Sequence, residues 1–297
     1  MREFEEIKKH LKLKTDEREG VFFYLPQASE FKKQEIIFHD AIHQAEEEVH
    51  QLNSLRNVYY HDYFKKYLNN LSKDSIILEL GAGSGYDSLP LVKSGHQLII
   101  SDISPKSVLG VKARLASSYP ELAEQPIYLV ADGQHLPLPD QAVEAVFMVA
   151  CLHHFENQAT ALDELTRVVK PGGQIICAME PSKFMMSFTK LFSRSKSLRI
   201  HQGHSEADET HPGYNKSAWQ RLTINKPLAI TKLKRVWLAQ GFLHYGLEAL
   251  FRIFKLKKRL KIPRWLEWAL WLVDEILLTI PFINQLNWHW LVVISRI

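Results

Sequence analysis

The sequence predicts an α/β protein built on a doubly wound, mostly parallel sheet. Short apolar runs alternate along the chain with amphipathic stretches, and the runs expected to be strands are Ile76–Leu80, Gln97–Ser101, Ile127–Val130, Val143–Cys151 and Gln174–Met179. Runs that are apolar on both faces are typical of parallel strands covered by helices on either side of the sheet. Polar residues follow several of these runs, at the carboxyl ends of the strands, where ligands bind in such sheets.

The helices expected between those strands have recognisable ends. Ser88–Lys93 is a helical run that stops at Gly95, Pro105–Ser118 stops near Pro120, and Ala159–Val169 runs into the turn "KPGG". Ahead of the first strand, residues 30–71 have a helical pattern of apolar positions. The crossovers between the parallel strands are expected to be right-handed.

Composition limits the class of protein. A chain of 297 residues with 46% hydrophobic content can bury a large core, and a formal charge of +4 is too small to steer the whole chain onto nucleic acid. The first twenty residues carry charge throughout and lack the apolar run of a signal peptide. Only two cysteines, Cys151 and Cys177, are present, which rules out a disulfide scaffold and predicts a reducing, cytoplasmic setting.

The most informative stretch is "LELGAGSGYD", which joins the first strand to the helix after it. Glycines allow positive φ angles and let a ligand approach the backbone next to a helix N-terminus. A dinucleotide loop reads G-x-G-x-x-G, but Tyr86 stands where its third glycine would be. Glu79, directly before the loop, suits a ligand with a cationic amine better than a diphosphate.

An ordered set of motifs carries a family resemblance. "LELGAGSG", "SDIS", "VADGQHLPLPD", "CLHHF" and "ALDELTRVVKPGGQIICAMEP" follow one another between about residues 75 and 181. The set resembles that of class I, Rossmann-like S-adenosylmethionine-dependent methyltransferases of the small-molecule type, with a looser match through "LKRVWLAQGF" and "WHWLVVISR". The resemblance implies seven strands in the order 3-2-1-4-5-7-6 with the seventh antiparallel. It makes Phe242–Leu250 the sixth strand and Trp288–Ser295 the seventh.

The resemblance also implies a cofactor, S-adenosyl-L-methionine, with S-adenosyl-L-homocysteine as the product. Gly81, Ala82, Gly83 and Gly85 would line its methionine part, and Glu79 would lie near its ammonium group. A second interpretation of Glu79, a buried and paired carboxylate without a ligand contact, stays open.

Residues after the later strands would hold the rest of the cofactor. Asp102 would accept hydrogen bonds from the ribose hydroxyls, and Ile103 would pack on the adenine. Asp132 would take the adenine amino group, with Gly133 donating from its backbone, and Cys151 would face the sulfonium. From the residues alone, Asp102 could instead cap the helix that begins near Pro105, and Asp132 could be a turn residue.

His153 and His154 are the candidate catalytic residues. They follow the fourth strand, where a base could remove a proton from the methyl acceptor, and histidine titrates near neutral pH. A turn that leads the chain into the next helix is the alternative role for His154. A second group, His201, His204, Glu206, Asp208 and His211, lacks the helical H-x-x-x-H pattern and a cysteine, so no metal site is expected.

The C-terminal third contains a basic stretch and an apolar one. "RIFKLKKRLKIPR" has seven Lys/Arg residues and no acid, and "WLEWALWLVDEILLTIPFI" follows it. Acidic residues interrupt this run, so it is not expected to span a membrane. The expectation is packing against the sheet edge, peripheral contact of residues 252–283 with the inner face of an anionic membrane, or contact with a partner helix.

Together these features predict a cytoplasmic methyltransferase acting on a small, hydrophobic or lipid-linked acceptor. The expected domains are an N-terminal helical lid region at 1–71 and a methyltransferase core at 72–297, with substrate-side insertions at about 182–228 and 251–287. The alternatives are a nucleic-acid or protein methyltransferase, a non-catalytic cofactor-binding protein and a nicotinamide dehydrogenase. The place after the fourth strand reads "ACLHHF" and not the N/D-P-P-Y/F motif of amino-methylating nucleic-acid enzymes, so nucleic acid is not an expected partner.

Overall fold

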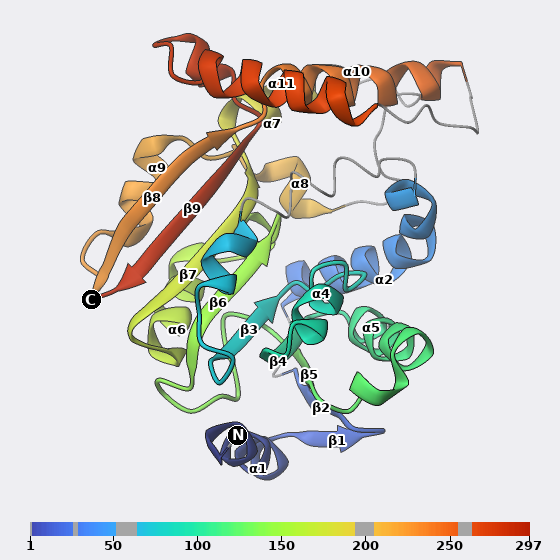
Figure 1. The fold of residues 1–297 in the computed structure, drawn as a ribbon, viewed down its shortest axis with the longest axis vertical. Helices are drawn as coiled ribbons and strands as arrows, with labels where there is room; N and C mark the ends of the chain where they lie inside the picture. The colour runs from blue at the N-terminus through green and yellow to red at the C-terminus, as the bar shows by residue number, and fades with distance from the viewer. Residues whose placement is uncertain (1, 26–28, 52–63, 194–204, 255–262) are drawn as a thin grey trace.

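The fold is a central sheet with helices on both faces and a pair of helices across one end (Figure 1). It is seen in a computed structural model that describes residues 2–25, 29–51, 64–193, 205–254 and 263–297. The strands are β1 (Asp16–Arg18), β2 (Val21–Tyr24), β3 (Ile76–Leu80), β4 (Gln97–Asp102), β5 (Ile127–Ala131), β6 (Val143–Val149), β7 (Val169–Pro181), β8 (Leu228–Val236) and β9 (His289–Arg296).

The helices alternate with these strands through most of the chain. They are α1 (Arg2–Lys14), α2 (Glu30–Gln51), α4 (Ser88–Lys93), α5 (Pro105–Ser118), α6 (Gln158–Val168), α7 (Lys183–Ser193), α8 (Glu206–Thr210), α9 (Lys216–Thr223), α10 (Ala239–Ile253) and α11 (Arg264–Leu277). Short 3-10 turns include η2 (Leu152–His154), and a further helical segment covers residues 64–69.

Within the described residues, the strands form one nine-stranded sheet in the order β1-β2-β5-β4-β3-β6-β7-β9-β8. The expected count of seven strands is therefore wrong, and the full order differs from the expected one because β1 and β2 extend the sheet beside β5. β2 pairs with β5 in parallel, and β9 is antiparallel to both β7 and β8. Residues 1–71, expected to be helical, thus also contribute two strands.

The expected sixth strand, Phe242–Leu250, is also wrong, because those residues lie inside α10 and the strand before β9 is β8. Two features explain the misplacement. A β-bulge between Ile230 and Lys232 breaks the alternation of apolar and polar residues in β8. The next segment, α10, is rich in apolar residues, and a short apolar run cannot be assigned to a helix or a strand from its sequence alone.

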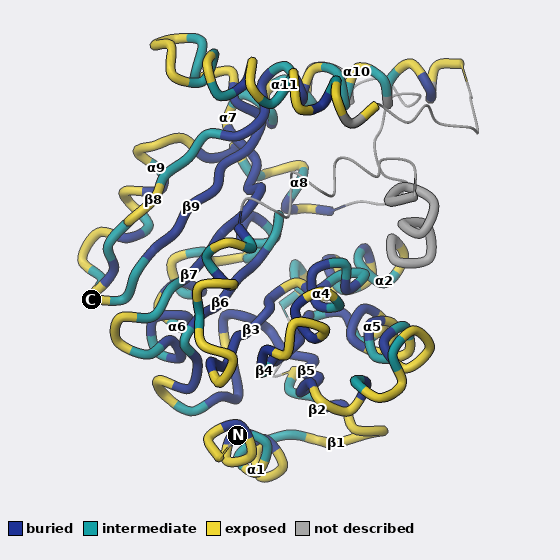
Figure 2. The backbone as a smooth tube through the Cα atoms, in the orientation of Figure 1, coloured by how far each residue is buried: buried dark blue, intermediate teal, exposed yellow. Residues whose placement is uncertain are grey.

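The core lies on both faces of the sheet, and successive strand residues point to opposite sides. Leu78 packs in one cluster, which contains residues of α1, α6 and α9. Its neighbour Ile77 packs in the other cluster, which contains residues of α4, α5 and the 64–69 segment. The central strands β3, β4, β5 and β6 are the most continuously buried part of the backbone, whereas β1 is exposed (Figure 2). This burial fixes the strand ends, and with them the residues that follow each strand.

Candidate functional site

The loop after β3 depends on its glycines. Gly81, Gly83 and Gly85 have φ angles of 68°, 51° and 73°, in the left-handed region that favours glycine. A Cβ on Gly81 would lie 2.5 Å from the Cys151 sulfur, and a Cβ on Gly85 would lie 2.7 Å from a methyl carbon of Val111. The loop therefore lies close to the end of β6 and to α5. Its amides at Ala82, Gly83 and Gly85 are bonded within the protein, and Gly81 is the exposed position of the loop.

Glu79 is buried at the end of β3, directly before this loop, and accepts a hydrogen bond from the Ser88 hydroxyl. Burial, together with the nearby Asp87 carboxylate, raises the pKa of Glu79 well above its ordinary value. A carboxyl group in such a place gains most from a cationic neighbour, because a cation offsets the cost of burying the charge.

Asp102 holds the glycine loop to the end of β4. One carboxylate oxygen accepts from the Gly83 amide at 2.9 Å, and the other accepts from the Ser104 amide at 2.8 Å. The helix cap that Asp102 could have supplied comes instead from Ser104, whose hydroxyl oxygen accepts from the Ser107 amide at the start of α5. Ile103, half-buried, lies between these residues.

Asp132 follows β5 and is 5% exposed. It accepts from the Gln134 amide at 3.0 Å and forms an ion pair of 2.5 Å with the ammonium group of Lys32, which comes from α2. A Cβ on Gly133 would lie 2.6 Å from the ring of Phe155, so the backbone there passes close to the turn after β6. No sequence pattern predicted Lys32 at this place.

Glu180, at the end of β7, organises the turn after β6. Its carboxylate accepts from the backbone amides of Cys151 at 2.9 Å, Leu152 at 2.7 Å and His153 at 3.2 Å. Burial opposes ionisation of Glu180, but these bonds and the His153 ring outweigh it and lower its pKa. Burial raises the pKa of the Cys151 thiol well above its ordinary value, so this thiol stays protonated.

His153 lies between two carboxylates. Its Nδ1 is 2.9 Å from Glu180, and its Nε2 is 3.5 Å from Asp208 of α8. Burial favours the neutral ring, but the two carboxylates prevail and raise the pKa of His153 to about 9. At neutral pH the ring is therefore an imidazolium that donates to both carboxylates, and it can accept an acceptor's proton only after losing its own.

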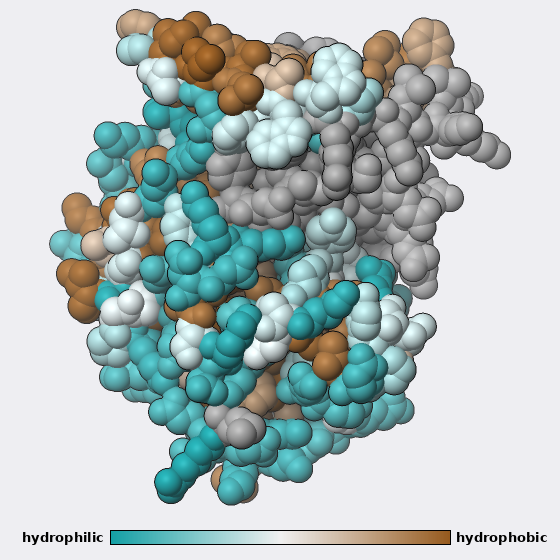
Figure 3. Space-filling view, in the orientation of Figure 1, coloured by the Kyte–Doolittle hydropathy of each residue, from teal (hydrophilic) through white to brown (hydrophobic). Residues whose placement is uncertain are grey.

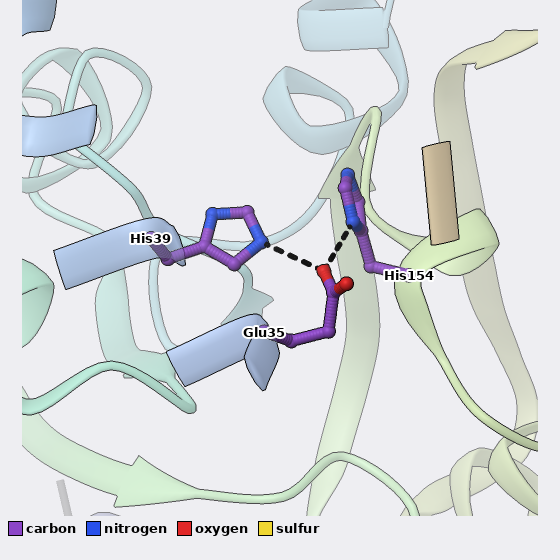
Figure 4. Close-up of side chains that lie close together, drawn as sticks. All are labelled: Glu35, His39 and His154. Atoms are coloured by element: carbon purple, nitrogen blue, oxygen red, sulfur yellow. Dashed lines mark hydrogen bonds and ion pairs between the residues drawn. The ribbon is translucent and has the colours of Figure 1, made fainter. Parts of the chain in front are cut away.

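His154 belongs to a second set of contacts, with two residues of α2 (Figure 4). Its Nδ1 lies 2.9 Å from Oε2 of Glu35, and Nε2 of His39 lies 3.6 Å from the same oxygen. Burial opposes ionisation of Glu35, but the two imidazoles hold its pKa well below the usual range. Burial and the neighbouring His153 lower the pKa of His154.

Sequence reasoning missed Glu35 and His39, which lie more than a hundred residues before His154. The available signal was their i, i+4 spacing, which places both side chains on one face of a helix. Of the 201–211 group, Asp208 and His211 join the site, and burial and His153 lower the pKa of His211 to about 4. His201 and His204 lie outside the described residues.

Among the residues that the structure describes, two groups of side chains have ligand atoms close enough for a metal ion. Glu35, His39 and His154 form one, and His153, His154 and Asp208 form the other, each with ligand atoms within 4.8 Å of one another. Both groups lie beside the turn after β6, at the edge of the sheet formed by the carboxyl ends of the strands, where Glu79, Asp102 and Asp132 are also found.

Comparison with known proteins identifies the central part of the chain. Residues 78–177 match the family described as "Methyltransferase domain". A demethylmenaquinone methyltransferase of Tropheryma whipplei (strain Twist) is 29% identical over 120 residues, which cover 40% of this chain and 48% of that protein. One from Clavibacter sepedonicus is 34% identical over 100 residues, covering 34% and 39%. The chain spans about half the length, or less, of these curated relatives.

Solved structures share the fold at low sequence identity. MccD protein has a TM-score of 0.51 and 15% identity, with 80% of this chain and 96% of that chain covered. Haemonchus contortus phosphoethanolamine N-methyltransferase 2, solved with S-adenosyl-L-methionine, has a TM-score of 0.51 and 16% identity, covering 81% and 52%. The match at 78–177 contains the glycine loop, the acids after β4 and β5, and the two histidines. The chain therefore carries a methyltransferase domain of the class I, Rossmann-like kind.

Proposed function

We propose that the protein transfers a methyl group from S-adenosyl-L-methionine to a small, hydrophobic or lipid-linked acceptor. The observation that carries the proposal is the convergence of three positive-φ glycines with acids at the carboxyl ends of three neighbouring strands, β3, β4 and β5. The cofactor has one cationic amine, two ribose hydroxyls and an adenine amino group, and a carboxylate is a suitable partner for each.

The methionine part of the cofactor is proposed to lie along Gly81, Ala82, Gly83 and Gly85, with its ammonium near Glu79. A cation there would lower the pKa of the buried Glu79 and restore its charge. The cofactor and the ionised carboxylate would then stabilise each other.

The nucleoside part is proposed to bind after β4 and β5. Asp102 keeps lone pairs for the ribose hydroxyls beside its two backbone bonds, and Ile103 would pack on the adenine. Asp132 would take the adenine amino group and Gly133 would donate from its backbone. Because Lys32 already pairs with Asp132, the adenine would share that carboxylate with Lys32 or displace it.

Methyl transfer is proposed to occur in front of the turn that contains Cys151, His153 and His154. In an in-line displacement the acceptor atom bonds to the methyl carbon while the carbon–sulfur bond breaks, and the sulfonium becomes the thioether of S-adenosyl-L-homocysteine. The acceptor's proton, where it has one, would leave toward His153 or His154, and His153 could accept it only after losing its own. Their carboxylate partners fix both rings in place.

A lipid-linked acceptor is supported by two observations. Curated relatives over the methyltransferase domain are named for demethylmenaquinone. In addition, α10, α11 and the segment after them expose many large apolar side chains, among them Trp265, Trp268, Leu272, Ile276 and Phe282. Brown patches lie over this end of the molecule (Figure 3). We propose that residues 252–283 meet a membrane surface there; of these, 255–262 lie outside the described residues.

A direct test uses methyl-labelled S-adenosyl-L-methionine with reduced demethylmenaquinone as the acceptor. We expect label to enter the organic phase. We also expect His153→Asn to lower turnover more than cofactor affinity, because His153 lies in the turn after β6, in front of which methyl transfer is proposed to occur. Cofactor binding without transfer to this acceptor or to a panel of apolar phenols and amines would favour a non-catalytic binding protein.

A further inference from the structure

We propose that Glu35, His39 and His154 form a binding site for a divalent transition-metal ion such as Zn²⁺. The site joins α2 to the turn after β6 and is separate from the strand-end residues assigned to the cofactor. It does not depend on the proposed methyl transfer, since metal binding can be measured on the protein without cofactor or acceptor.

The two separations between Glu35 and the histidines are already near those that an ion requires, and all three ligand atoms lie within 4.8 Å of one another. Glu35 Oε2 lies 2.9 Å from His154 Nδ1 and 3.6 Å from His39 Nε2. Zinc bonds to nitrogen and oxygen are ~2.0–2.2 Å long, so tetrahedral ligands lie ~3.4 Å apart. Figure 4 shows both imidazoles directed at the same carboxylate oxygen. Small rotations of these side chains would place an ion between them.

The carboxylate is held for this geometry by a second layer of contacts. Ser205 donates its hydroxyl proton to Glu35 Oε1 at 3.0 Å, and the Ala207 amide donates to the same atom at 3.3 Å. The Ser205 hydroxyl also lies 3.2 Å from Oε2, the oxygen that the two imidazoles face, and 3.4 Å from His154 Nδ1. Metal sites in proteins characteristically fix their ligating carboxylates with such outer hydrogen bonds.

Burial and charge also favour a cation at this place. The side chains of Glu35, His39 and His154 are 3%, 24% and 15% exposed. Besides Glu35, the carboxylates of Asp102, at the end of β4, and Asp208, on α8, also act on His39. A buried group of carboxylates with imidazoles needs positive charge, which a divalent ion supplies at one point. Two imidazoles with one carboxylate suit Zn²⁺, Co²⁺, Fe²⁺ or Ni²⁺ better than Mg²⁺ or Ca²⁺.

The competing group, His153, His154 and Asp208, is the weaker candidate. Its carboxylate is 41% exposed, and His153 already donates to Glu180 at 2.9 Å. The two groups share His154, so an ion in one excludes an ion in the other. Asp208 belongs only to the competing group, and a change there distinguishes them.

The test titrates Co²⁺ into full-length, tag-free protein that has been stripped with a chelator. We expect one equivalent of Co²⁺ to bind with visible absorption bands and to be displaced by Zn²⁺. His39→Asn and Glu35→Gln should weaken binding at least 100-fold, and Ser205→Ala about 10-fold through the carboxylate. Asp208→Asn should leave the affinity within a few-fold of the unchanged protein. The control is His10→Asn, which makes the same substitution in α1, outside the group.

Several results would overturn the proposal: no specific Co²⁺ binding by the unchanged protein, equal loss in the His10 and His39 variants, or loss in Asp208→Asn with retention in His39→Asn. Circular dichroism checks the folding of each variant. If a ligand variant fails to fold, X-ray absorption on the unchanged protein with Zn²⁺ decides the matter. Two imidazoles with one carboxylate support this site, and fewer than two imidazoles contradict it.

Discussion

At the scale of single residues, two buried carboxyl groups in the same site behave in opposite ways. Glu180 accepts hydrogen bonds from three backbone amides and from the His153 ring, and its pKa is lowered although the carboxylate is completely buried. Glu79 receives a hydroxyl from Ser88 and lies near the Asp87 carboxylate, and its pKa rises. Glu180 therefore serves the structure as an ion, whereas Glu79 becomes favourable as an ion only when a cation binds beside it.

Glu79→Gln should raise the stability of the ligand-free protein near neutral pH. Because the folded-state pKa of Glu79 lies above the unfolded value, its contribution to stability is fully present below about pH 4.5 and is lost as the pH rises toward the folded-state value. The glutamine variant avoids this loss. We expect the two proteins to be similarly stable at pH 4 and the variant to be the more stable of the two at pH 7.5, by a margin that grows as the pH rises.

Urea denaturation at several pH values measures this difference. Glu5→Gln, on the exposed face of α1, is the control and should show no comparable trend. A difference between Glu79→Gln and the unchanged protein that stays constant from pH 4 to pH 8 would contradict the burial argument. The same variant should also bind S-adenosyl-L-methionine more weakly than the unchanged protein, because it lacks the carboxylate proposed to pair with the cofactor's ammonium group.

At the scale of secondary-structure elements, the sequence predicted the strands that carry the site and missed the elements at the edges of the sheet. β3 to β6 are apolar on both faces, and their boundaries follow from that pattern. β1 and β2 are three and four residues long, too short for an alternating pattern to stand out. Their place beside β5 depends on pairing across a hundred residues, which local patterns do not reveal.

The candidate site divides in the same way. The glycine loop and the acids after β4 and β5 are predictable, because each directly follows a recognisable strand. The contributions of Lys32, Glu35 and His39 were not predictable. These side chains reach the site from one face of α2, and the sequence pattern of a helix does not reveal which part of the chain that face packs against. Long-range charge pairing is set by packing of the whole chain.

β2 gives a test of the extended sheet. Phe22 is 2% exposed and packs in the cluster with α1, whereas Phe23 is half-buried. If β2 belongs to the sheet, Phe22→Ala should lower the free energy of unfolding by about 3–5 kcal/mol, because a large side chain leaves a cavity in the core. Phe23→Ala is the matched control and should cost clearly less. Equal, small costs measured by chemical denaturation would mean that β2 does not pack on the core.

At the scale of the whole molecule, large apolar side chains are gathered at one end. The described part of α10, α11 and the segment after them contains Trp265 at 70% exposure and Phe282 at 83%. Among the described residues, no helix is both long enough and apolar enough to cross a bilayer. An amphipathic helix beside basic residues is the arrangement that lies along a membrane surface.

The protein should therefore sediment with vesicles that contain anionic lipid and bind weakly to neutral ones. Replacing Trp265 and Trp268 with alanine should reduce the partition coefficient about 10-fold or more, since both are more than half exposed on α11 and aromatic rings favour the interface. Leu13→Ala, an equally exposed apolar change on α1, is the control. Vesicle binding that does not respond to the tryptophan change would argue against this surface.

The most direct measurement of the central claim is calorimetric titration of S-adenosyl-L-methionine into the purified protein and into Asp102→Ala. Asp102 fixes the Gly83 amide and is the proposed acceptor for the ribose hydroxyls, so its loss removes both functions. The account predicts saturable one-to-one binding by the unchanged protein and a loss of at least 100-fold in affinity in the variant, with a native circular dichroism spectrum. Absence of binding by the unchanged protein, or equal affinity in a folded Asp102→Ala, would contradict it.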